Sequence, residues 1–87
     1  MARVYLPGSL IRLFPGAPRH VEVEAATVGE AIAWLEAHWP GMSSRLCDTE
    51  PALRPHIKVF VDGEPATLCT PIAAASEVLI VPAVSGG

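Results

Sequence analysis

One segment of this chain has the length and spacing of an amphipathic helix, which limits how the rest can fold. Residues 27–30, Thr-Val-Gly-Glu, have the form of a capping box, in which the threonine hydroxyl accepts from the Glu30 amide and the glutamate reaches back. Pro40-Gly41 ends the pattern. We therefore predict one long helix over residues 27–39. Apolar residues at helical spacing form its buried stripe: Val28, Ala31, Ile32, Leu35 and Trp39.

The other regular patterns are those of strands. Residues 3–6 and 20–24 alternate with period two, and in the second run the valines point inward and the acids outward. Residues 56–61 are the clearest strand, and Asp62-Gly63 follows as a hairpin-turn dipeptide before a short return strand within residues 65–70. The last strand is expected over residues 78–84. Pro82 should lie near its end, because proline has no amide with which to extend a ladder.

The connections complete the predicted fold. Residues 9–19 carry enough apolar side chains to fold back onto the body, and residues 42–48 suggest a short helical turn with Leu46 beneath it. The element order is then β-β-α-β-β-β, which predicts an α+β fold with a mixed sheet of four or five strands over one long helix. Residues 1–84 would form this one domain, and residues 85–87, Ser-Gly-Gly, a flexible tail.

Composition argues against several classes of function. The 87 residues suffice for a single hydrophobic core, and with 51% apolar content we expect a packed domain. The formal charge is -3 without a basic cluster, so neither nucleic acid nor an anionic membrane is an expected partner. No apolar run approaches the roughly 20 residues of a transmembrane helix, and the first residues lack a signal-peptide pattern. We therefore expect a cytoplasmic protein.

The sequence has no pattern of an autonomous enzyme. His20, His38 and His56 are far apart, and the isolated Cys47 and Cys69 form no metal-ligand motif. There is also no catalytic triad, phosphate-binding loop or dinucleotide-binding motif. We therefore expect no catalytic residue, no metal and no bound cofactor. Whether either cysteine is reactive stays open.

Several of these features together resemble a known family. They are the element order, the capped helix, the Val-Phe-Val-Asp-Gly-Glu hairpin at residues 59–64, and the ending Val-Pro-Ala-Val-Ser-Gly-Gly at residues 81–87. Over essentially the whole chain they resemble sulfur carriers of the MoaD/ThiS type, which have the ubiquitin-like β-grasp fold. The long first connection and the Ser-Arg-Leu-Cys-Asp segment at residues 44–48 resemble the carriers used for cysteine biosynthesis.

The resemblance implies that partner enzymes act on the carboxylate of Gly87. An E1-like enzyme would adenylate it with ATP, a sulfur donor would convert it to a thiocarboxylate, and a downstream enzyme would accept the sulfide. Val84, Ser85 and Gly86 would enter the partner together with Gly87. Glycine suits such a tail because it has no Cβ and can pass through a narrow channel. The receiving pathway stays open between cysteine, molybdopterin, thiamin, thiolated tRNA and a secondary metabolite.

A partner must also hold the body of the carrier. If Ile57, Val59 and Val61 pack on the helix, Phe60 stands on the outer face of the sheet, because strand side chains alternate. By analogy with ubiquitin-like sheets, Leu79 and Val81 also face out. Tyr5 and Arg3 would join them, and such a patch is typical of a partner surface. The alternative is that residues 9–19 cover the patch.

Two other functions remain open at this point. The chain could be a ubiquitin-like modifier that is joined through Gly87 to lysines of other proteins, since the activation step would be the same. It could also be a non-catalytic subunit of a complex with an inert tail.

Overall fold

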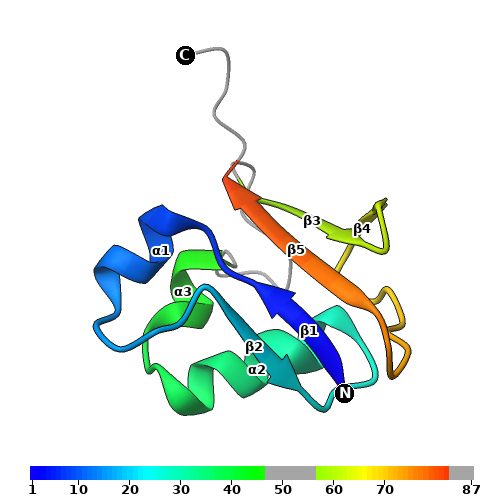
Figure 1. The fold of residues 1–87 in the computed structure, drawn as a ribbon, viewed down its shortest axis with the longest axis horizontal. Helices are drawn as coiled ribbons and strands as arrows, with labels where there is room; N and C mark the ends of the chain where they lie inside the picture. Colours follow the sequence, from blue (N-terminus) through cyan, green and yellow to red (C-terminus); the bar gives the residue numbers. More distant parts are fainter. Residues whose placement is uncertain (47–56, 83–87) are drawn as a thin grey trace.

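The computed structural model describes residues 1–46 and 57–82, which form a mixed sheet with helices packed on one face (Figure 1). In chain order the elements are β1 (Ala2–Tyr5), α1 (Gly8–Leu13), β2 (His20–Val23), α2 (Val28–His38), α3 (Met42–Leu46), β3 (Ile57–Val61), β4 (Glu64–Ala66) and β5 (Glu77–Pro82). The five strands lie in the order β2-β1-β5-β3-β4. The central pair, β1 and β5, is parallel, and the other neighbours are antiparallel. The predicted α+β class and mixed sheet are confirmed.

The core lies between the inner face of the sheet and α2. The predicted helix stripe is confirmed for its first four positions, which are buried, whereas Trp39 is only partly buried and ends the helix. The short helices α1 and α3 close the core beside α2. The buried side chains include Val4, Val23, Val59, Val78 and Ile80 from the sheet, Val28, Ile32 and Leu35 from α2, and Leu10, Met42 and Leu46 from α1 and α3.

The segment after β1 contains a helix where we predicted an irregular connection. Pro7 occupies the position before α1 in an extended conformation, and Leu10 is only 5% exposed because it enters the core. Phe14, at the end of α1, lies beside Gly41 in the turn between α2 and α3. The segment thus folds back onto the body, as expected. A helix of six residues is too short to show a periodic pattern.

The capping box predicted for α2 is present with one change. The Thr27 hydroxyl accepts a hydrogen bond from the Glu30 amide at 3.2 Å. The Glu30 carboxylate accepts from the amide of Ala26 at 3.0 Å, one residue before the position of the usual reciprocal bond. Two amides at the start of the helix are therefore satisfied by side chains, which fixes the point where the chain leaves β2 and enters α2.

The β3–β4 hairpin has the two-residue turn that the sequence predicts. Val61 pairs with Glu64, so Asp62 and Gly63 form the turn, and their φ angles are 52° and 85°. Two positive φ angles are typical of a type I′ turn. We expect Gly63→Val to lower the free energy of unfolding by roughly 2 kcal/mol, because a β-branched residue is strained at positive φ. Open space surrounds the Cβ position, so a clash is not the cause.

Urea denaturation measures this effect. Gly63→Asn is the matched control, because asparagine tolerates this conformation, and it should cost much less. Equal losses in the two variants would show that the backbone angle is not what selects glycine here.

A second cap joins α2 to α3 and was not predicted. The Glu36 carboxylate accepts from the Gly41 amide at 3.0 Å and from the Ser43 amide at 2.9 Å. These backbone hydrogen bonds lower the pKa of Glu36 below its usual value of 4.5. A carboxylate with a lowered pKa stabilises the folded state above its unfolded pKa, and this contribution is lost as the pH falls through the folded pKa.

We therefore expect Glu36→Gln to melt at a lower temperature than the wild type at neutral pH. The difference should shrink as the pH falls below 4.5, because the wild-type carboxylate then becomes protonated. Thermal melts over this pH range check it, with Glu64→Gln as a control for the loss of one surface charge. A difference that does not depend on pH would contradict the assignment.

Candidate functional site

The face of the sheet away from the helices carries a row of apolar and aromatic side chains across the strands. The strand register brings Tyr5 of β1 beside Leu79 of β5, and Leu79 beside Phe60 of β3. His20 of β2 and Pro65 of β4 lie at the two ends of this row. We call Tyr5, Phe60, Leu79 and Val81 the outer patch.

The structure places the outer patch where the strand alternation predicted it. Leu79 is 44% exposed, and the other three members are partly buried. Val81 pairs with Lys58, whose side chain is exposed on the same face. An exposed leucine beside two aromatic rings gives a partner a surface from which it can exclude water. The role of the patch in docking stays a prediction.

Two apolar side chains of the first connection, Leu10 and Phe14, lie away from the outer patch. Leu10 is buried in the core, and Phe14 lies 3.5 Å from the Cβ position of Gly41, between the helices. These two side chains therefore do not cover the outer patch, and Leu13, the third that the alternative considered above depends on, is 52% exposed.

Three residues of the outer patch, Tyr5, Phe60 and Leu79, line a pocket on the surface of the sheet. This open pocket has a volume of about 400 Å³, and Asp62, Gly63 and Glu77 complete its lining. The Tyr5 hydroxyl donates a hydrogen bond to the Glu77 carboxylate at 3.2 Å. We call this hollow the outer-face pocket. It combines an aromatic, apolar lining with two carboxylates.

A hydrogen-bond network fixes the carboxylate end of the outer-face pocket. Asp62 accepts from the Ser76 hydroxyl at 3.0 Å and from the Glu77 amide at 2.9 Å. The Asp62 amide donates to the Glu77 carbonyl at 2.9 Å, and the buried Ser76 hydroxyl also accepts from the Ala73 amide. The hairpin turn is thereby tied to the start of β5. This network could not be predicted from the sequence, because its residues lie in separate segments of the chain.

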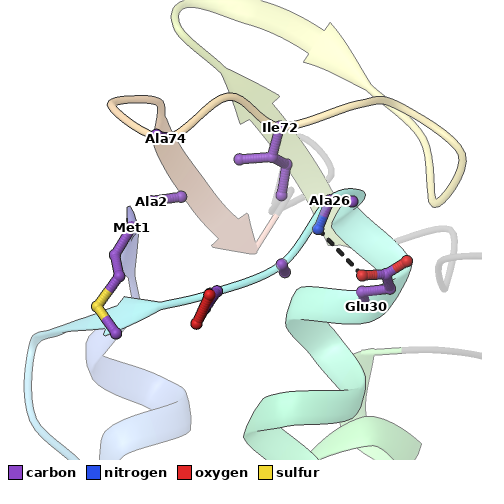
Figure 2. A pocket seen from close by; sticks show the side chains of 8 residues that line it. Met1, Ala2, Ala26, Glu30, Ile72 and Ala74 are labelled. Carbon is purple, nitrogen blue, oxygen red and sulfur yellow. Dashed lines mark hydrogen bonds between the residues drawn. The ribbon is translucent and has the colours of Figure 1, made fainter.

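A second pocket lies between the start of β1 and the segment that leads from β2 into α2 (Figure 2). Its volume is about 490 Å³. Half of its lining residues are alanines, and its Glu30 carboxylate accepts a hydrogen bond from the Ala26 amide, as Figure 2 shows. That carboxylate therefore already serves the helix cap. The lining residues are Met1, Ala2, Glu24, Ala25, Ala26, Glu30, Ile72 and Ala74.

The histidines and cysteines of the described segments are dispersed. His20 contacts Tyr5 edge-on, with ring centroids 5.7 Å apart, and His38 stacks on Trp34 at 3.7 Å. Cys69 is an exposed free thiol. No group of three potential metal ligands occurs within residues 1–46 and 57–82, and no helix there is long and apolar enough to cross a bilayer. Cys47 and His56 lie outside the described residues.

The predicted reactive tail also lies outside the described residues. The described part of β5 ends at Pro82, which pairs with Ile57, and residues 83 and 84 of the predicted strand lie outside the described residues. Val84, Ser85, Gly86 and Gly87, together with the expected boundary between domain and tail, fall beyond this point. The parallel pairing of β5 with β1 places this strand in the middle of the sheet.

Comparisons with known proteins agree on one family. The ThiS family model matches residues 4–87. "Sulfur carrier protein CysO" of Mycobacterium tuberculosis (strain ATCC 25618 / H37Rv) is 33% identical over 85 residues, covering 91% of both chains. "Small archaeal modifier protein 1" of Haloferax volcanii is 40% identical over 62 residues, covering 71% of both. A chain in the crystal structure of the Amycolatopsis orientalis BexX/CysO complex matches over 100% of both chains, with 31% identity and a TM-score of 0.86.

Proposed function

Because this chain belongs to the ThiS family, we propose that it is a sulfur carrier whose reactive group is the C-terminal carboxylate of Gly87. The observation that carries the proposal is similarity over nearly the whole chain to a protein named as a sulfur carrier. The family match also extends through Gly86 and Gly87. On this proposal the protein is a cosubstrate of other enzymes rather than an enzyme, and it works in the cytoplasm.

The chemistry would take place on the tail. A carboxylate is a poor electrophile, so a carboxylate oxygen of Gly87 first attacks the α-phosphate of ATP in an E1-like partner, releasing pyrophosphate. Sulfide, supplied by a donor, then attacks the acyl carbon, the bond to the phosphate oxygen breaks, and AMP leaves, which gives the thiocarboxylate. A downstream enzyme finally accepts the sulfide, in a cysteine or molybdopterin-type pathway. The chain itself needs no bound cofactor for this, because the partner binds ATP.

The outer patch would hold the carrier while the tail enters the partner. Its exposed Leu79 and flanking aromatic rings suit an apolar partner surface. The similarity to a CysO chain that was crystallised in complex with another protein supports such docking. Val84 and Ser85 would then bridge the distance between the end of the sheet and the partner's nucleotide site.

An exchange assay tests the first step. The purified chain is incubated with ATP, labelled pyrophosphate and each E1-like enzyme encoded in the same genome. Label should enter ATP only when the chain is present, because formation of the acyl-adenylate is reversible. No exchange with any of these enzymes would count against the proposal.

One observation favours a second function, that of a protein modifier. It is the 40% identity to a protein named as an archaeal modifier. On this alternative, the activated Gly87 forms an amide with lysines of other proteins. Expression of a tagged chain in its native cells separates the two functions, because a modifier gives covalent tagged conjugates that disappear when Gly87 is deleted. A non-catalytic subunit would give neither conjugates nor a thiocarboxylate.

A further inference from the structure

The outer-face pocket contains two carboxylates that form no ion pair within the described part of the chain. Asp62 and Glu77 both line it, next to Tyr5, Phe60 and Leu79. Within residues 1–46 and 57–82, neither carboxylate forms an ion pair. Arg3, which lies opposite Glu77 in the strand register, pairs instead with Glu22 at 3.2 Å.

Both carboxylates are held in place by neutral donors. The Asp62 carboxylate accepts hydrogen bonds from the Ser76 hydroxyl and the Glu77 amide. The Glu77 carboxylate accepts one from the Tyr5 hydroxyl. These bonds orient the oxygens but leave the negative charges. When an apolar partner surface covers the outer patch, water is displaced from around these charges. Such a burial is costly unless the partner supplies a cation.

We propose that the outer-face pocket receives an arginine side chain of the enzyme that activates the carrier. The aliphatic part of the arginine would lie along Leu79, and the planar guanidinium would contact the Tyr5 and Phe60 rings while donating to Glu77. Arginine fits better than lysine, because its fork of donors can bond a carboxylate while its face covers an aromatic ring. The inference rests on the proposed function only in naming the activating enzyme as the partner.

A peptide titration tests the chemistry of the pocket without any enzyme. The ¹⁵N-labelled chain is titrated at low salt with acetyl-Leu-Arg-Leu-amide and with the same peptide carrying citrulline, the neutral isostere of arginine. We expect saturable shifts at the amides of Tyr5, Gly63, Glu77 and Leu79, with the arginine peptide binding roughly fivefold more tightly. Glu77→Gln should abolish this preference. Equal binding of the two peptides, or no saturable shift at the pocket, would overturn the proposal.

The activation kinetics test the identity of the partner. Glu77→Gln can still accept from the Tyr5 hydroxyl but has no charge, so it should raise the KM for the carrier about fivefold to tenfold with little change in kcat. Glu64→Gln is the matched control, because it removes the same charge from an exposed strand residue of the same sheet that does not line the pocket. Thermal melts of both variants exclude a loss of folding as the cause. An unchanged KM for Glu77→Gln would show that the activating enzyme does not place a cation there.

The two proposals fail in different ways. If no enzyme adenylates the wild-type chain, the proposed function fails, but the peptide titration still tests whether the pocket prefers arginine to citrulline. If the wild type is adenylated but the peptides and Glu77→Gln behave as neutral controls, the carrier function stands and the arginine contact is wrong.

Discussion

Removal of Gly86 and Gly87 should abolish adenylation of this chain by its activating enzyme while the fold stays intact. The shortened chain still ends in a carboxylate, but that carboxylate belongs to Ser85 and cannot reach the position held by the last residue. Misplacement of a reacting group by about 1 Å can already cost roughly a hundredfold in rate. We therefore expect at least that loss in the pyrophosphate-exchange assay.

Two controls keep this result interpretable. The melting temperature of the truncated chain should match that of the wild type, because the described core ends at β5. Ser85→Ala keeps the length of the tail and should be adenylated at nearly the wild-type rate, because a small side chain remains at this position. Full activity of the truncated chain would favour the non-catalytic subunit over the sulfur carrier.

Phe60→Glu should sharply weaken engagement with the activating enzyme. Phe60 lies on β3 between Leu79 and Pro65 on the outer face, and it lines the outer-face pocket. A carboxylate at this position would be buried by the partner without a second cation and next to Glu77. We expect a rise of about tenfold or more in the KM for the carrier, because central aromatic residues carry much of the binding energy of an interface.

The fold should tolerate the same substitution. Phe60 is only partly buried, and its neighbours on the inner face, Val59 and Val61, supply the core contacts of this strand. Ala33→Glu is the matched control, because it adds the same charge on the exposed side of α2. A large fall in the melting temperature of Phe60→Glu would show that this ring belongs to the core rather than to a docking surface.

Local patterns in the sequence were enough for most of the fold. Period-two alternation in residues 20–24 and 56–61 gave the correct inner and outer faces, because it is a direct consequence of strand geometry. The buried stripe of α2 and the Asp62-Gly63 turn could also be predicted, since each depends on residues a few positions apart. The short helix α1 was missed because its pattern is brief and is surrounded by proline and glycine.

The outer-face pocket was only partly predictable. Tyr5 and Phe60 could be assigned to the outer face from alternation, but the contact between the Tyr5 hydroxyl and Glu77 joins residues 72 positions apart. Asp62 looked like a turn residue alone, and its bonds to Ser76 and Glu77 depend on how β3 and β5 pair. Contacts of this kind follow from topology rather than from spacing along the chain.

The central claim is that other proteins perform sulfur chemistry on the acyl group of Gly87. Intact-mass spectrometry after incubation with ATP, the activating enzyme and a sulfide source tests it most directly. The account predicts that the mass rises by the difference between one sulfur and one oxygen atom, and that the change maps to the C-terminal proteolytic fragment. An unchanged mass, or the gain of a whole sulfur atom on a cysteine such as Cys69, would contradict it.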